Sequence, residues 1–202
     1  MADRLSEQYS PILALAGSPR RKGNTERLLD VMIAGAAEQG VHSEKIMVRD
    51  LKVSPCVEIY ECATSGQCAI KDDMTALYPK LLQARVIIVA SPIFFYGPPA
   101  QLKAVIDRCQ ALWSRKYLLK QTSDRPSGKG VLISAAASGG AKLFDGLLLT
   151  IRYFFDTLDI KLEHELLVRG VDEAGAVDSK AEALEQAGAI GRELANFVLH
   201  SA

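Results

Sequence analysis

Short apolar runs alternate with longer amphipathic segments along most of the 202-residue chain. We predict that five runs rich in apolar and β-branched residues are strands, at residues 11–16, 43–48, 85–90, 130–136 and 160–168. The runs at 12–16 and 86–90 are almost continuously apolar, which is typical of strands buried on both faces. Helical spacing of apolar residues predicts five helices between and after the strands, at residues 24–39, 73–84, 99–113, 142–158 and 179–199.

This alternation predicts an α/β fold, in which helices cover both faces of one parallel sheet. No linker or internal repeat divides the chain, so we expect residues 1–202 to form a single domain. Open sheets of this kind bind ligands outside the carboxyl ends of their strands, where the strand order reverses. The loops after the first and third predicted strands are therefore the first candidates for a functional site.

The loop after the first predicted strand reads Gly-Ser-Pro-Arg-Arg-Lys-Gly-Asn-Thr at residues 17–25 and leads directly into a helix. Glycines for tight turns, short polar side chains and unpaired N–H groups at a helix start together favour phosphate. The loop lacks the Gly-Lys-Ser/Thr of nucleoside-triphosphate loops and the Gly-x-Gly-x-x-Gly of dinucleotide loops, so a mononucleotide phosphate is the ligand that it favours. A plain connection with Asn24 capping the helix explains the same residues equally well.

The loop after the third predicted strand reads Ser-Pro-Ile-Phe-Phe-Tyr-Gly-Pro-Pro at residues 91–99. An aromatic cluster between prolines suits a flat, partly apolar ring, although core packing more often explains such a cluster on its own. The ring hypothesis is favoured here because this loop is expected beside the phosphate loop. Ser138 and the two glycines after it follow the fourth predicted strand, and they are either a third wall of the site or a plain turn.

These residues resemble the flavodoxin-like NAD(P)H-dependent FMN reductases and their iron–sulfur flavoprotein relatives. The similarity rests on residues 17–25, on Ser-Pro-Ile-Phe-Phe-Tyr-Gly-Pro-Pro-Ala-Gln-Leu-Lys at 91–103, and on Asp107-Arg108. It implies a flavodoxin-like three-layer α/β sandwich with a five-stranded parallel sheet in the order 2-1-3-4-5. It also implies that the FMN phosphate is bound by Ser18, Arg20, Gly23, Asn24 and Thr25, and the ring by Pro92, Ile93, Phe94 and Phe95. Many relatives have a tyrosine where Phe94 stands, so backbone contacts are expected there.

The resemblance further implies an FMN-dependent oxidoreductase that takes hydride from NAD(P)H and passes electrons to a quinone, a flavin, a metal ion or a similar acceptor. Since the flavin carries the redox chemistry, no catalytic acid or base residue is expected. The implied partners are the nicotinamide cosubstrate and a small-molecule acceptor, and a homodimer or homotetramer is expected, with residues 112–117 as a possible contact. A flavodoxin-type electron-transfer protein and an iron–sulfur flavoprotein are the alternatives.

Iron–sulfur relatives hold their cluster with four closely spaced cysteines, and this chain resembles them at only three of the four positions. Cys56, Cys62 and Cys68 occupy three positions, and Ile59 occupies the fourth. Because a four-iron cluster normally takes four thiolates, we expect no iron–sulfur cluster and no metal ligands. A structural remnant, a bound cluster, and a zinc site or reactive thiol are the three alternatives for this segment.

The chain carries 24 basic and 24 acidic residues, so it is not a strongly basic nucleic-acid-binding protein. The last 47 residues hold ten acids and four bases, which leaves a net charge of +6 on the first 155. Bases concentrate between residues 103 and 129. This stretch is either a solvated surface or a site that attracts a cosubstrate phosphate. Neutrality disfavours an electron carrier, which usually meets its partner through a charged face. A polar N-terminus without a long apolar run predicts a cytoplasmic protein that does not bind membranes.

Overall fold

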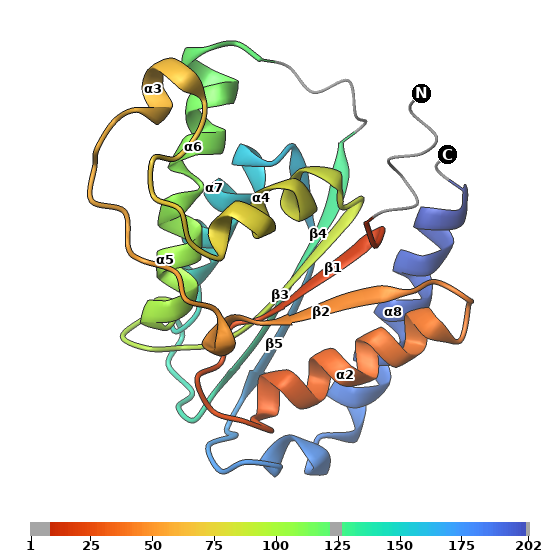
Figure 1. Ribbon diagram of the computed structural model, residues 1–202. Helices are drawn as coiled ribbons and strands as arrows, with labels where there is room; N and C mark the ends of the chain where they lie inside the picture. The colour runs from red at the N-terminus through yellow and green to blue at the C-terminus, as the bar shows by residue number, and fades with distance from the viewer. Residues whose placement is uncertain (1–8, 122–126, 201–202) are drawn as a thin grey trace.

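Five parallel strands form one sheet in the order β2-β1-β3-β4-β5 in the computed structural model, which describes residues 9–121 and 127–200 (Figure 1). The strands are β1 (Ile12–Ala16), β2 (Ser43–Met47), β3 (Val86–Pro92), β4 (Gly128–Ala136) and β5 (Ile160–Arg169). All four neighbouring pairs are parallel. The flavodoxin-like fold and its strand order are confirmed, and the strand ends lie within two residues of the predicted ones.

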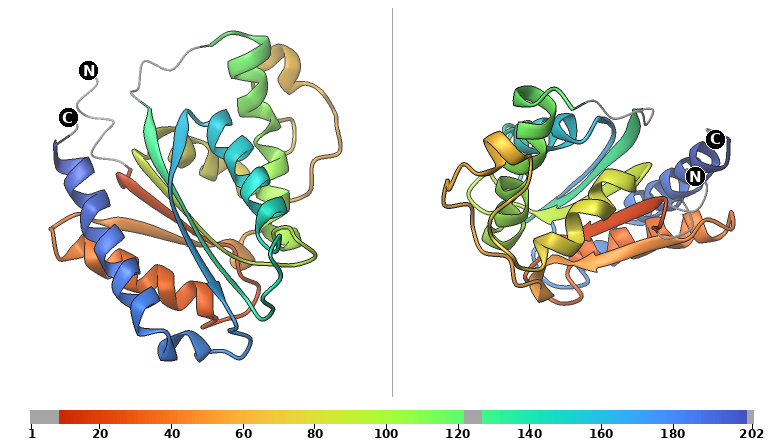
Figure 2. Two further views of the ribbon diagram at one scale, coloured as in Figure 1. Left: turned by 180° about the vertical axis from the view of Figure 1, so that it is seen from behind. Right: turned by 45° about the horizontal axis from the view of Figure 1, so that its top comes forward.

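Helices cover both faces of the sheet (Figures 1 and 2). The long helices are α2 (Asn24–Ala37), α4 (Met74–Gln83), α5 (Ala100–Arg108), α7 (Asp145–Thr157) and α8 (Ala181–His200). The short helical segments are η1 (Val48–Asp50), α3 (Cys62–Ser65), α6 (Gln110–Trp113), η2 (Ser114–Leu118) and η3 (Ala176–Ser179). The predicted helix at 99–113 is interrupted at Cys109, where α5 ends and α6 begins. None of the helices in the described ranges is long and apolar enough to cross a membrane.

Alternating side chains of the interior strand β1 contribute to both cores. Ile12, Ala14 and Ala16 pack with α2 and α8, whereas Leu13 and Leu15 pack with α4, α5 and α7. Because helices cover both faces, every β1 side chain is buried, which explains its continuous apolar run. This arrangement leaves the carboxyl ends of the strands and their loops as the open edge of the sheet.

Helices α2 and α8 lie side by side on one face of the sheet (Figure 2). At their crossing the two backbones are so close that only glycine fits. A Cβ atom on Gly191 would lie 2.0 Å from the carbonyl oxygen of Met32, and one on Gly35 would lie 2.4 Å from that of Gly188. Since both obstructing atoms belong to the backbone, the two helices must separate to admit even a methyl group.

We therefore expect Gly191→Ala to lower the free energy of unfolding by about 1–3 kcal/mol, the usual cost of overpacking. Denaturant unfolding followed by circular dichroism measures this change. Gly139→Ala is the matched control, because a Cβ atom at Gly139 would meet no atom within 4 Å. Equal stability of Gly191→Ala and the wild type would contradict the close helix crossing.

Candidate functional site

A pocket of about 380 Å³ opens at the carboxyl edge of the sheet, between the loops that follow β1, β3, β4 and β5. It has the size of an ordinary small-molecule site. Its lining includes all nine residues predicted from the sequence: Ser18, Arg20, Gly23, Asn24, Thr25, Pro92, Ile93, Phe94 and Phe95. The structure thus brings the two predicted loops together, around one cavity.

One end of the pocket is formed by the start of helix α2. Gly23 is the N-cap residue, with φ −76° and ψ 169°, and no side chain caps the helix. The N–H groups of the first turn have no acceptor within the helix, and the helix dipole adds partial positive charge there. The buried Ser18 hydroxyl accepts the N–H of Arg20 at 3.2 Å, which shapes the loop in front of them. This end of the pocket is suited to an anion.

Asn24 does not cap the helix, so the cap expected of Asn24 was wrong. Its side-chain amide donates to the carbonyl oxygen of Glu173 at 2.9 Å, and its amide oxygen accepts the N–H of Val177 at 3.2 Å. The Asn24 side chain therefore fastens the β1–α2 loop to the segment that follows β5. Its backbone N–H, in the uncapped first turn, is the group that it offers to an anion.

Arg20 also reaches across the pocket mouth. Its Nη1 donates to the carbonyl oxygen of Asp172 at 2.8 Å, which joins the phosphate loop to the β5 side of the pocket. Several lining residues were not identified from the sequence, namely Tyr96, Ala135, Ala136, Leu143, Val171 and Asp172. The signal for most of them is their position at the carboxyl end of β4 or shortly after β5, because the carboxyl ends of parallel strands share one edge.

The other end of the pocket is a tight aromatic turn. Phe94 and Gly97 exchange two backbone hydrogen bonds, of 2.9 and 3.0 Å, around Phe95 and Tyr96. Both central residues have positive φ, 48° for Phe95 and 65° for Tyr96, which costs about 1–2 kcal/mol for each non-glycine residue. Helix α7 fixes the turn from behind, because a Cβ atom on Gly146 would lie 2.6 Å from the carbonyl oxygen of Tyr96. Strained turns of this kind gather at ligand sites.

Five of the six described bases between residues 103 and 129 are held by ion pairs or hydrogen bonds, and the sixth, Lys120, is exposed. Lys103 pairs with Asp107 at 2.7 Å, Lys116 with Asp159 at 2.8 Å, and Lys129 with Glu163 at 3.4 Å. Arg108 is buried against Asp72, Arg115 donates to the carbonyl oxygen of Gly66, and Arg125 lies outside the described residues. These contacts favour the interpretation of the basic stretch as a solvated, mostly paired surface over that of a site that attracts a cosubstrate phosphate.

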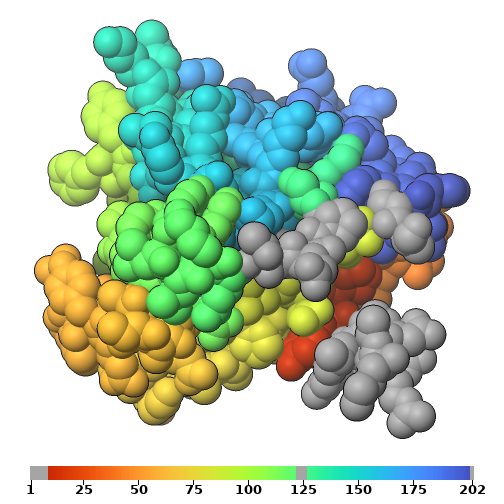
Figure 3. All heavy atoms as spheres, turned by 90° about the horizontal axis from the view of Figure 1, so that it is seen from above, coloured from red at the N-terminus to blue at the C-terminus, as the bar shows by residue number. Residues whose placement is uncertain are grey.

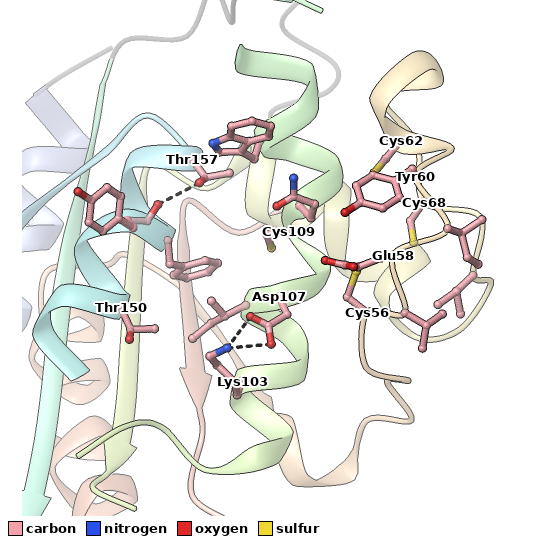
Figure 4. A pocket seen from close by; sticks show the side chains of 18 residues that line it. Cys56, Glu58, Tyr60, Cys62, Cys68, Lys103, Asp107, Cys109, Thr150 and Thr157 are labelled. Atoms are coloured by element: carbon pink, nitrogen blue, oxygen red, sulfur yellow. Dashed lines mark hydrogen bonds and ion pairs between the residues drawn. The ribbon is translucent and has the colours of Figure 1, made fainter. Parts of the chain in front are cut away.

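A second pocket, of about 590 Å³, lies beside helices α5 and α6, and all four cysteines line it (Figure 4). Cys56, Cys62 and Cys68 lie on the loop that covers it, here called the cysteine loop (residues 54–72), and Cys109 lies between the two helices. In the space-filling view the cysteine loop stands out in orange beside the green α6–η2 segment (Figure 3). Burial raises the pKa of the Cys109 thiol to about 12, so it remains protonated.

The base of the cysteine loop is held by a buried ion pair. Arg108 donates to both carboxylate oxygens of Asp72, at 2.7 and 3.2 Å, and to the carbonyl oxygens of Ser54 and Ile70, at 2.9 and 3.0 Å. Asp72 in turn accepts the backbone N–H groups of Ser54 and Met74. Protein contacts alone thus close the loop at both ends.

Residues 10–160, well over half of the chain, match the family model described as NADPH-dependent FMN reductase. The chain belongs to the NADPH-dependent FMN reductase family. This family member is 42% identical over 106 residues to an iron–sulfur flavoprotein of Archaeoglobus fulgidus, which covers 52% of the chain and only 54% of that relative's length. It is 31% identical over 159 residues to an iron–sulfur flavoprotein of Methanosarcina thermophila, covering 79% and 76% of the two chains.

Solved structures agree on the fold of this FMN reductase family member. An NAD(P)H:quinone oxidoreductase from Methanothermobacter marburgensis superposes with a TM-score of 0.68 and 20% identity, over 91% of this chain and 94% of that one. An archaeal flavodoxin superposes with a TM-score of 0.56 and 15% identity, over 94% and 99%. At these identities, the likeness shows the flavodoxin-like fold.

The cofactor of the family, FMN, fits the first pocket. FMN joins a phosphate to a flat ring system, and the pocket joins an uncapped helix start to an apolar, aromatic turn. Glycine at position 23 leaves the helix start open to a ligand, because a serine, aspartate or asparagine there would cap the helix itself. The donors and the ring wall are thus both supplied by the chain.

An iron–sulfur cluster does not fit the second pocket. The described ranges contain no group of three or more His, Cys, Asp or Glu side chains arranged to hold a metal ion. Ile59 stands at the position of the missing thiolate, with its side chain exposed. Cys109 adds a fourth sulfur to the pocket lining, but its side chain is buried between α5 and α6. We therefore assign no chemistry to a cluster in this FMN reductase family member.

Proposed function

We propose that the protein is an FMN-dependent oxidoreductase that takes hydride from NAD(P)H and passes electrons to a small acceptor such as a quinone, a flavin or a metal ion. The observation that carries this proposal is the meeting of an uncapped helix start and an aromatic turn in one pocket of an FMN reductase family member. Bound FMN supplies the hydride and electron chemistry. The protein's part is to hold the cofactor and leave it accessible.

The phosphate would be bound at the start of α2, by the backbone N–H groups of residues 23–25 and the side chains of Ser18, Arg20 and Thr25. The ring would lie against Pro92, Ile93, Phe94 and Phe95, with the backbone of the strained turn fixing its edge. Phe95 is fully exposed and Phe94 is half exposed, so this wall stays accessible to a cosubstrate.

Steady-state assays of the protein with and without added FMN test this function. We expect NADPH or NADH oxidation in the presence of a quinone or free riboflavin, dependent on added FMN. Binding of FMN without turnover by either nicotinamide would instead indicate a flavodoxin-type carrier, which takes electrons from a protein reductase.

An iron–sulfur flavoprotein is the second candidate, because the relatives from Archaeoglobus fulgidus and Methanosarcina thermophila carry that name. Iron and acid-labile sulfide, measured on protein purified without oxygen, distinguish the two candidates. We expect far less than one iron per chain, since Ile59 replaces a thiolate. About four irons per chain would establish the cluster-bearing alternative.

We further propose that the chain acts as a single-domain homodimer or homotetramer in the cytoplasm. Its cysteines are free thiols throughout the described ranges, which suits a reducing compartment. In the stretch expected to make a subunit contact, Trp113 and Tyr117 pack on each other with ring centroids 5.5 Å apart. The partners are the nicotinamide and the acceptor, with no nucleic acid or membrane.

A further inference from the structure

We propose that Arg49, acting through Glu26, positions the phosphate loop and makes the flavin site selective for the phosphorylated flavin over riboflavin. Neither residue lines the pocket, and neither is predicted from the sequence to belong to the site. The inference rests on the proposed function, because it takes the 18–25 loop to be the phosphate site. It makes Arg49 a positioning residue, placed beneath the loop by η1, directly after β2.

The loop is tied down by a chain of hydrogen bonds that begins at Arg49. Its Nη1 donates to the carboxylate of Glu26 at 3.0 Å and to the carbonyl oxygen of Arg20 at 3.4 Å. The same Glu26 oxygen accepts the backbone N–H of Lys22 at 3.1 Å. Lys22 has φ +52°, a conformation that costs a non-glycine residue free energy unless the surroundings hold it. Arg49 and Glu26 therefore fix the backbone at two points of the loop.

The pair is nearly buried, which makes its hydrogen bonds strong and its geometry rigid. The side chains of Arg49 and Glu26 are 10% and 11% exposed. Burial alone would raise the pKa of Glu26, but hydrogen bonds from Arg49 and Lys45 outweigh it and lower the pKa, so the carboxylate is charged at neutral pH. Charged hydrogen bonds in such surroundings are stronger than neutral ones.

Arg49 also neutralises negative charge beneath the phosphate loop. Glu26 lies in the first turn of α2, where a bare carboxylate would repel a phosphate. Arg49 and Lys45 offset Glu26 and Asp30, so this cluster has no net charge. Removing the Arg49 guanidinium would leave it one unit negative, close to a ligand group of about two negative charges.

Titrating the flavin-free protein with FMN and with riboflavin, by flavin fluorescence, tests the proposal, because riboflavin has the same ring and no phosphate. We expect Arg49→Met to weaken FMN binding roughly tenfold or more, because charged hydrogen bonds are lost. Riboflavin binding should change less than about twofold. Arg49→Lys keeps the charge and should recover part of the FMN affinity. Should Arg49→Met fail to fold, Arg49→Lys alone is expected to lose FMN affinity without losing riboflavin affinity.

Arg27→Met is the matched control, because Arg27 lies next to Glu26 on α2 and forms an exposed ion pair with Asp178 at 2.8 Å. It should leave the ratio of the two affinities unchanged. An equal loss of both affinities in the Arg49 variants would leave their ratio unchanged and assign Arg49 a merely structural role, which would refute the inference. Unchanged FMN affinity in Arg49→Met would refute it as well. If the wild type binds neither flavin, the proposed function itself fails, which is a different result.

Discussion

Replacing Gly23 by aspartate is expected to stabilise the flavin-free protein and to weaken its FMN binding at least about a hundredfold. The backbone at Gly23 has the extended conformation of an ordinary N-cap, and a Cβ atom there would make only ordinary contacts, the nearest to the Ser18 hydroxyl at 3.5 Å. An aspartate should therefore cap α2 and contribute about 0.5–1 kcal/mol to stability. Its carboxylate would take the N–H donors that the phosphate needs and repel the phosphate by a few kcal/mol at close range.

Thermal unfolding and flavin titration measure the two opposite effects of this substitution. Gly23→Asn is the matched control, because asparagine caps a helix about as well as aspartate but adds no charge. It should stabilise the protein similarly and weaken FMN binding less. An aspartate variant that binds FMN like the wild type would show that the phosphate lies elsewhere.

Replacing Asp72 by asparagine is expected to lower the free energy of unfolding by about 3–5 kcal/mol, because it leaves a buried arginine without its counter-charge. The Arg108 side chain is fully buried and the Asp72 side chain is 12% exposed. For a protein of this size, the loss corresponds to a melting temperature roughly 10 °C lower. Since the ion pair also closes the cysteine loop, limited proteolysis should cut that loop sooner than in the wild type.

Asp107→Asn is the matched control for this substitution. Asp107 pairs with Lys103 one turn away on α5, with both side chains nearly half exposed, so its loss should cost about 0.5 kcal/mol or less. If the two variants were equally stable, the Arg108–Asp72 pair would not be the anchor of the loop.

The acid dependence of stability gives an independent check on Asp72. Burial alone would raise the pKa of Asp72, but hydrogen bonds from Arg108 and from two backbone N–H groups lower it below its ordinary value of 3.8. Its contribution to stability is therefore complete above that value and is lost as the pH falls through the lower pKa of the folded state. The free energy of unfolding of the wild type should fall as this contribution is lost in acid. That of Asp72→Asn should fall less steeply over the same pH range.

The sheet was predictable because hydrophobic periodicity is local and β1 and β3 are buried on both faces. The five long helices were predictable for the same reason. The short segments α3, η1 and η3 were not, because one or two turns carry no periodic signal. The break at Cys109 was also missed, since apolar residues continue at helical spacing across it.

All nine predicted site residues line one pocket because the rule for parallel sheets places the loops after β1 and β3 at the same edge. The roles of particular side chains needed the structure. Asn24 fastens a distant loop, Arg20 reaches Asp172, and Glu26 and Arg49 lie behind the loop, which are long-range contacts that no local pattern encodes. The ion pairs of Lys116 with Asp159 and of Lys129 with Glu163 were hidden for the same reason.

Reduction of the bound flavin by a nicotinamide, followed by visible absorbance without oxygen, shows directly whether the protein is an FMN reductase. We predict that NADPH or NADH bleaches the absorbance of FMN bound to the wild-type protein. Gly23→Asp, which is expected to fold but to bind FMN weakly, should show no such bleaching at the same flavin concentration. Dithionite, added last, verifies that the flavin is reducible. Bound FMN that stays oxidised with both nicotinamides, yet bleaches with dithionite, would contradict the reductase account.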